Sequence, residues 1–215
     1  SNYQVTFINA IFESISGLTG TGFSVFENIK YLDPTLILWR SSAQWIGGLY
    51  FLFFLILIFS NNKFNFKMNN LTFSGDGGLN FEANVKGLLS KIFIIYSSLS
   101  LIIFVLLNIV EIRLFNSLNL SMSMISTGGF LPTNSLNTII KTNPQKIVFI
   151  FALLISILNF FLILNIFQKK TIVREHKEDF YLIVFSIIFV FLIYFNNYDG
   201  LDIVISVLSS LGNSG

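Results

Sequence analysis

Three stretches of the chain share a short motif whose residues could hold a cation. They cover residues 14–23, 121–130 and 207–215, and they align without a gap. Each places a short apolar segment ahead of four small residues that are Gly, Thr, Ser or Asn. Glycine adopts positive φ without steric cost and lets the main chain approach a ligand. Backbone carbonyls exposed in this way, helped by Ser and Thr hydroxyls, can replace the hydration shell of an alkali cation.

The main alternative for such residues is packing between helices in lipid, where Gly, Ser and Thr are also common. Three copies in matching positions favour a selectivity filter over packing. No cage of carboxylates accompanies the motifs, which argues against a divalent-cation site. The sequence shows no nucleophile–base pair and no glycine-rich phosphate loop leading into a helix, so we expect no enzyme, no cofactor and no nucleic-acid partner.

The elements that position these motifs follow from composition. Hydrophobic residues make up 53% of the chain and charged residues 11%, whereas a soluble domain carries about 25% charged residues. A bilayer core requires about 20 apolar residues in a helix. Helices are expected because an open sheet would leave backbone groups unsatisfied in lipid. Four stretches without a charged residue therefore predict four membrane spans, at residues 41–62, 92–110, 147–168 and 180–198.

The distribution of basic residues predicts the topology. Eight of the thirteen Lys and Arg residues lie in two of the connections between spans. Loops rich in Lys and Arg stay in the cytoplasm, so all three motifs are expected to face outward. The eight residues are Lys63, Lys67, Lys86, Lys91, Lys169, Lys170, Arg174 and Lys177.

A short helix that cannot span is expected before each motif, at residues 1–17, 114–125 and 200–211. Asp33 before Pro34 is typical of a helix N-cap, and it predicts the start of the first span. The unit is therefore span, short helix, motif, span, and it occurs once whole, at 91–168. All copies point the same way, which indicates parallel repeats about an axis along the membrane normal. In this arrangement we expect the short helices to direct their partly negative C-terminal ends at a central cavity between the repeats, which favours a cation there.

For single polar and aromatic residues near the predicted outer side, we favour structural roles over a role in ion passage. Glu13 could attract cations at the outer mouth, but a hydrogen-bonded or solvated helix residue is favoured. Arg40 is expected to be a snorkelling anchor at the end of the first span. Trp39 and Trp45 are expected in the interfacial aromatic belt or against the first short helix.

The chain resembles the TrkH/KtrB family of bacterial potassium uptake proteins, which are related to plant and fungal transporters. The resemblance lies in Trp39-Arg40 with the Gln-Trp-Ile-Gly-Gly run at 44–48, and in residues 12–17, which are similar to the family's first pore helix. It covers nearly the whole chain. That family folds as four linked span–pore helix–span units around a pore, so we expect an all-α membrane protein and an internal fragment of such a chain.

The resemblance implies a division of the chain and a set of filter residues. The expected parts are a first repeat with pore helix, filter and second span at 1–60, a cytoplasmic loop at 61–90, the complete second repeat at 91–168, a cytoplasmic turn at 169–179, and the start of the third repeat at 180–215. The filter glycines would be Gly22, Gly129 and Gly215. Potassium would be held at Thr19, Gly20, Thr21, Gly22, Ser126, Thr127, Gly128, Gly129, Gly212, Asn213, Ser214 and Gly215.

The implied function is potassium uptake across the bacterial cytoplasmic membrane by a multi-pass protein. The implied partners are the lipid bilayer, a second copy in a homodimer, and a cytosolic nucleotide-binding regulatory subunit of the TrkA/KtrA type. This subunit would dock on residues 61–90 and 168–179. Two alternatives stay open at this point. One is a sodium-coupled or sodium-permeable member of the same superfamily, although Gly22 resembles the potassium-permeable type; the other is a non-conducting structural membrane protein.

Overall fold

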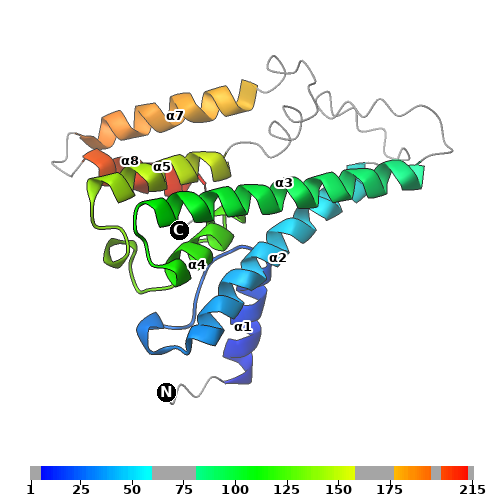
Figure 1. Ribbon diagram of the computed structural model, residues 1–215, viewed down its shortest axis with the longest axis horizontal. Coiled ribbons are helices and arrows are strands. Elements are labelled where there is room, and N and C mark those ends of the chain that lie inside the picture. The colour runs from blue at the N-terminus through cyan, green and yellow to red at the C-terminus, as the bar shows by residue number, and fades with distance from the viewer. Residues whose placement is uncertain (1–5, 60–80, 158–176, 195–199, 213–215) are drawn as a thin grey trace.

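The structure, a computed structural model, describes residues 6–59, 81–157, 177–194 and 200–212 (Figure 1). Every regular element within these ranges is helical, which confirms the predicted all-helical class. Two single 3-10 turns, Ile29–Tyr31 and Leu136–Thr138, lie in connections. The α-helices are α1 (Phe7–Leu18), α2 (Pro34–Phe59), α3 (Phe81–Ile109), α4 (Leu114–Ile125), α5 (Asn143–Ile157), α7 (Lys177–Tyr194) and α8 (Gly200–Leu211).

The short helices lie where the sequence predicts them. α4 and α8 have the predicted bounds, and α1, capped by Thr6, falls within the first predicted segment except for its last residue. Each has 12 residues, which at about 1.5 Å per residue is too short for a bilayer core of about 30 Å.

The predicted start of the first long helix is confirmed. α2 begins at Pro34, and the Thr35 amide donates to Asp33 Oδ1 over 2.8 Å. This is the N-cap bond that satisfies an otherwise unpaired amide of the first turn. The same hydrogen bond from Thr35 lowers the pKa of the Asp33 carboxyl below its ordinary value, because it stabilises the ionised form.

The long helices meet the length of a membrane span to different degrees. Among the described residues, one helical stretch, Gly87–Ile109 of α3, is both long and apolar enough to cross a membrane. The predicted spans at 41–62, 147–168 and 180–198 each extend into residues outside the described ranges. Of the cytoplasmic loop predicted at 61–90 and the turn predicted at 169–179, residues 81–90 belong instead to α3 and residues 177–179 to α7. The other residues of these two segments lie outside the described ranges.

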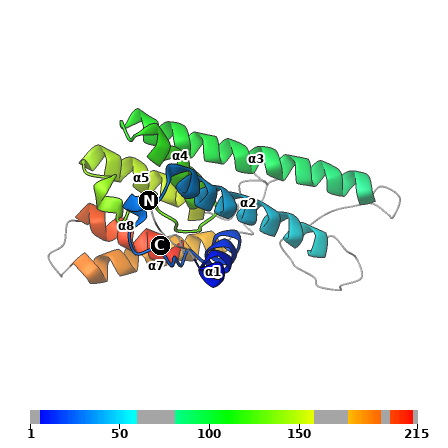
Figure 2. The same cartoon turned by 90° about the horizontal axis from the view of Figure 1, so that it is seen from below.

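The helices pack in an order that repeats. In both views α2 lies between α1 and α3 (Figures 1 and 2). α2 contacts the short helices α1 and α4, and α5 likewise contacts the short helices α4 and α8. The helix that follows each of the first two motifs therefore packs against the short helix before it and the next one along the chain. This arrangement places the motif after α1 next to the motif after α4.

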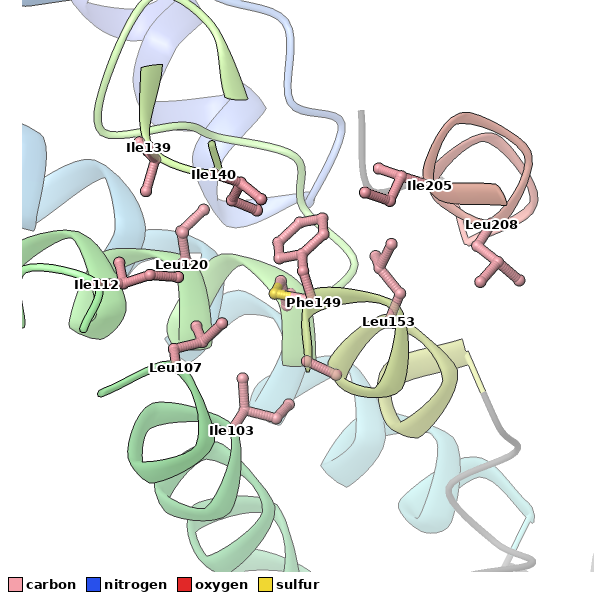
Figure 3. Close-up of a cluster of buried hydrophobic side chains, with 12 residues drawn as sticks. Ile103, Leu107, Ile112, Leu120, Ile139, Ile140, Phe149, Leu153, Ile205 and Leu208 are labelled. Carbon is pink, nitrogen blue, oxygen red and sulfur yellow. The ribbon is translucent and has the colours of Figure 1, made fainter. Parts of the chain in front are cut away.

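The main apolar core fixes α4, α5 and α8 relative to α3. Figure 3 shows Phe149 and Leu153 of α5 between Leu120 on one side and Ile205 of α8 on the other. Phe149 exposes 4% and Leu153 exposes 1% of its surface. Burying such side chains stabilises the packing by about 1.5–3 kcal/mol each.

Large apolar side chains also cover much of the outer surface. Phe7 and Ile8 of α1 expose 79% and 76% of their surface, and Phe185, Ile187 and others of α7 are exposed too. Exposed apolar side chains in such numbers indicate a membrane or protein interface. It agrees with the prediction that lipid is the solvent of this chain.

Candidate functional site

The first motif begins as a helix cap that glycine makes possible. Thr19 ends α1, and Gly20 follows with φ of +66°. The amide of Gly20 donates to the Gly17 carbonyl over 3.1 Å, and the amide of Thr21 donates to the Ser16 carbonyl over 3.1 Å. This pair of bonds is the Schellman motif, which needs a left-handed residue at the first position after the cap. The chain then turns away from the helix axis.

The second motif repeats the same backbone geometry. Ser126 ends α4, and Thr127 follows with φ of +51°. The Thr127 amide donates to the Met124 carbonyl and the Gly128 amide to the Ser123 carbonyl, each over 2.9 Å. These bonds connect the same motif positions as those in the first copy. The alignment made from the sequence is therefore also an alignment of conformation.

The glycines that end the two motifs share a second left-handed position. Gly22 has φ of +78° and Gly129 has φ of +77°. These are values that side-chain-bearing residues rarely adopt, at a cost of roughly 1–2 kcal/mol. We name residues 19–23 the first loop and residues 126–130 the second loop.

The two loops touch through their backbones. A Cβ atom added to Gly22 would lie 2.3 Å from the carbonyl oxygen of Gly128, whereas one added to Gly20 would lie 3.6 Å from the nearest atom, the Ser126 carbonyl oxygen. Only glycine fits at residue 22, both for its φ and for this contact. The C-terminal ends of α1 and α4 thus meet at one place, where their partly negative carbonyl ends favour a cation.

A buried ion pair between α1 and α2 fixes the position of the chain directly after the first loop. Glu13 Oε1 lies 2.6 Å from Arg40 Nε, and the two side chains expose 3% and 1% of their surface. The other carboxylate oxygen of Glu13 accepts from the Val25 amide over 3.0 Å. Ser24 donates to Glu13 over 3.0 Å and accepts from Arg40 over 3.0 Å. The pair therefore fastens the chain just after the first loop to both α1 and α2.

These contacts decide two sequence expectations. The favoured interpretation of Glu13, a hydrogen-bonded helix residue, is confirmed. The expectation that Arg40 is a snorkelling anchor is wrong, because its side chain is buried and paired with a carboxylate. Snorkelling would bring the charged group to water, whereas here it packs between rings, 4.1 Å from the centroid of Phe130 and 5.7 Å from that of Phe26.

The second loop is held by Gln44, which the sequence analysis did not single out as a site residue. Gln44 is fully buried on α2. Its Nε2 donates to the Gly128 carbonyl, and its Oε1 accepts from the Phe130 amide over 3.2 Å. An uncharged polar side chain inside a predicted membrane span was the available signal, because such groups are buried only with hydrogen-bond partners.

The two tryptophans differ in their surroundings. Trp39 exposes 45% of its surface, whereas Trp45 is half-buried and its Nε1 donates to Ser100 of α3 over 2.8 Å. Its ring lies 5.3 Å from that of Tyr96, centroid to centroid. Trp45 therefore ties α2 to α3.

Asn134 joins the two connections that follow the loops. Its Oδ1 accepts from the amides of Ile29 and Lys30, over 2.7 and 3.3 Å, and its Nδ2 donates to Asn28 over 2.9 Å. Hydrogen bonds of this kind contribute about 0.5–1.5 kcal/mol each. The two motifs are thus linked through α2 and also through the connections that follow the two loops.

The structure brings together eight of the predicted site residues, in the first and second loops. Of the four site residues predicted in the third motif the structure describes Gly212, which follows α8 and whose amide donates to the Leu208 carbonyl over 2.8 Å. Asn213, Ser214 and Gly215 lie outside the described residues. Within the described ranges no group of three or more His, Cys, Asp or Glu residues could hold a metal ion. The oxygens present at the loops are carbonyls and hydroxyls, which suit a monovalent cation.

Comparisons with known proteins give a consistent result. The model of the TrkH family, described as a cation transport protein, matches residues 1–214. An uncharacterized cation transporter of Methanocaldococcus jannaschii is 28% identical over 130 residues, which are 60% of this chain and 27% of that protein. The potassium uptake protein TrkG of Escherichia coli is 25% identical over 202 residues, covering 86% of this chain and 39% of that protein.

The solved structure of the potassium transporter TrkH from Vibrio parahaemolyticus matches with a TM-score of 0.74 at 20% identity. The match covers 97% of this chain and 44% of that chain. The fold is therefore shared along almost all of the present chain. This chain spans less than half the length of the proteins that it matches.

Proposed function

The chain belongs to the TrkH family of cation transport proteins, and on this premise we propose that it forms part of a pore that takes potassium into the cell. The first and second loops are two sides of the selectivity filter, and their carbonyl oxygens replace water around the ion. The single observation that carries this proposal is the backbone contact between two loops of equal conformation, at Gly22 and Gly128. Packing of helices in lipid requires small residues, but it does not require matched left-handed turns.

We propose that α1, α4 and α8 are pore helices of successive repeats. Residues 1–60 are then the second part of a first repeat, 91–168 a complete second repeat, and 180–215 the beginning of a third, joined by cytoplasmic segments at 61–90 and 169–179. The third side of the filter is the Gly-Asn-Ser-Gly run at 212–215. Support comes from the packing, since α2 and α5 take equivalent places between successive short helices.

Potassium is the proposed ion because two lines of evidence agree. The named relatives TrkG and TrkH are a potassium uptake protein and a potassium transporter, and the filter loops offer neutral oxygens without a carboxylate among residues 19–23 and 126–130. Entry is driven by the membrane potential, at about 2.3 kcal/mol per charge per 100 mV. Passage of sodium and a purely structural role are outcomes that the experiment below distinguishes.

We propose that the protein is a multi-pass component of the cytoplasmic membrane. It acts as a homodimer, and a cytosolic nucleotide-binding ring of the TrkA/KtrA type docks on the inner segments at 61–90 and 168–179. The support for the inner position of these segments is their excess of basic residues, because loops rich in Lys and Arg favour the cytoplasmic side.

The test uses the complete gene in a bacterium that lacks potassium uptake. Growth and rubidium uptake at low potassium are compared for wild type, Gly129→Ser and the control Gly87→Ala. Gly87 lies on α3 with nothing within 4 Å of an added Cβ, whereas Gly129 has φ of +77°.

Rescue by wild type and by the control, with loss in Gly129→Ser at equal membrane abundance, supports a potassium filter. If wild type is present and takes up sodium but not rubidium, the ion is wrong. If Gly129→Ser takes up rubidium as well as wild type, the filter assignment fails and helix packing is the better explanation.

A further inference from the structure

We propose that Gln44 is a positioning residue for ion selectivity, because it holds the second loop at a fixed distance from the first. The inference rests on the proposed filter and extends it to α2, a helix that contributes no residue to the loops. Gln44 acts with Arg40, which lies one turn earlier on the same face of α2. We name Arg40 and Gln44 the buried polar face of α2.

Gln44 holds the second loop at two points. Its Nε2 donates to the carbonyl of Gly128, and its Oε1 accepts from the amide of Phe130. The side chain also packs on the loop itself, since a Cβ atom added to Gly128 would lie 2.4 Å from Gln44 Cδ. Gln44 therefore fixes the orientation of the peptide groups on both sides of Gly129.

The Gly128 carbonyl oxygen lies between Gln44 and the first loop. On one side it accepts the hydrogen bond from Gln44, and on the other it is the atom that a Cβ on Gly22 would meet. Without the amide donor, this peptide group could rotate, and the contact between the two loops would change with it. Gln44 of α2 therefore sets the distance between the two loops through its hydrogen bond to the Gly128 carbonyl.

Arg40 also contacts both the second loop and the segment that follows the first loop. Through Glu13 and Ser24 it holds the segment that follows the first loop, and its guanidinium stacks on Phe130 at the end of the second loop. A cation over an aromatic ring contributes about 0.5–2 kcal/mol, more when both are desolvated. One face of α2 therefore binds the second loop and the segment that directly follows the first loop, although these two parts are more than 100 residues apart in the sequence.

We expect the hydrogen bonds from Gln44 to affect the choice between potassium and sodium more than the rate of ion transport. Potassium and sodium differ in size, so discrimination depends on the number, distance and field strength of the carbonyl oxygens around the ion. Functional geometry of this kind is held to about 0.5 Å by surrounding hydrogen bonds. Loss of the Gln44 bonds keeps the carbonyls available as ligands but frees the Gly128 peptide group to move, so that the oxygens can close around a smaller ion.

The test replaces Gln44 in the complete protein and measures competition between ions. Gln44→Met keeps the length of the side chain and removes both hydrogen bonds. Gln44→Glu keeps the acceptor for the Phe130 amide and removes the donor to Gly128. The control is Ser41→Ala, because Ser41 is equally buried on α2 and its hydroxyl donates to the Ile37 carbonyl of the same helix.

The readout is the sodium concentration that halves rubidium uptake, together with the KM for rubidium and the amount of protein in the membrane. We expect this sodium concentration to fall by about twofold to tenfold in Gln44→Met, the range that one net hydrogen bond supplies. Gln44→Glu should change it in the same direction, and Ser41→Ala should match wild type.

Each outcome decides the inference separately from the proposed function. Failure of wild type to take up rubidium, or full activity of Gly129→Ser, overturns the proposed function itself. With those two results as expected, an unchanged sodium competition in Gln44→Met overturns the role of Gln44 alone. If Gln44→Met does not reach the membrane, Gln44→Glu decides; absence of both shows a role in assembly only and also overturns the inference.

Discussion

The buried pair of Glu13 and Arg40 allows a quantitative prediction, because a second ion pair of nearly the same length is available for comparison. Glu13 and Arg40 are 2.6 Å apart and their side chains expose 3% and 1% of their surface. Lys146 of α5 and Asp202 of α8 are 2.7 Å apart, but their side chains expose 13% and 46%. The two pairs thus differ in burial and not in distance.

Removing one member of the buried pair leaves a charge without compensation. In Glu13→Gln the guanidinium of Arg40 stays buried, and its Nη1 already has no hydrogen-bond partner among the described residues. Breaking a buried pair in this way costs about 3–5 kcal/mol. We expect Arg40→Met to cost a similar amount, because the Glu13 carboxylate then loses its counter-ion.

The double variant Glu13→Gln with Arg40→Met removes both charges together. Replacement of a complete buried pair by neutral groups is often nearly neutral in stability. We therefore expect the double variant to recover most of the loss of either single variant. For Lys146→Met and Asp202→Asn we expect at most about 1 kcal/mol each, because one member of that pair is exposed to solvent.

The assay is the midpoint of thermal unfolding of the purified complete protein. Unfolding is monitored as the fraction of protein that remains monodisperse after heating. All six proteins are measured in one detergent and at one pH. Equal midpoint shifts for the two pairs would refute the argument from burial. A double variant that loses the sum of both single losses would show that Glu13 and Arg40 act independently.

Three further predictions concern single residues. Gly22→Ala should abolish rubidium uptake at normal membrane abundance, whereas Gly20→Ala should reduce it less, because both have positive φ but only residue 22 would place its Cβ 2.3 Å from the facing backbone. Gly47→Ala should lower the amount of folded protein in the membrane, because its Cβ would meet an α1 carbonyl at 2.0 Å, and Gly87→Ala, with open surroundings, should not; quantitative blotting measures both. The Asp33 cap has a lowered pKa when folded, so its stabilisation is complete above the ordinary carboxyl pKa and is lost as pH falls through the folded value; unfolding midpoints in Asp33→Asn should therefore depend less on pH in the acidic range than those of wild type.

Much of the local structure could be predicted from the sequence. The bounds of α4 and α8 and the cap at Asp33 depend on residues within a few positions of one another, and so does the turn that ends α1 at Thr19 and Gly20. Such features are encoded by helix propensity, capping and glycine. The match between the first and second motifs also follows from local residues, since equal residue types after a helix favour equal turns.

The candidate site was predictable only in part. The loop residues were identified from their types and spacing, but the residues that hold the loops were not. Gln44 contacts a carbonyl 84 positions away, and Arg40 contacts a carboxylate 27 positions away. A polar residue in an apolar stretch has many possible partners, so the sequence indicates that a partner exists without naming it.

Residue types and their spacing are enough to show that this chain is helical, rich in apolar surface and built around a recurring glycine motif, because these properties depend on composition and on short-range patterns. The packed molecule is needed to show which loops meet, that Gly22 lies against Gly128, and that Arg40 is buried with Glu13 rather than extended toward water. These facts depend on how α1, α2 and α4 pack together. Packing is set by the fit of whole helix faces, and no single segment contains that information.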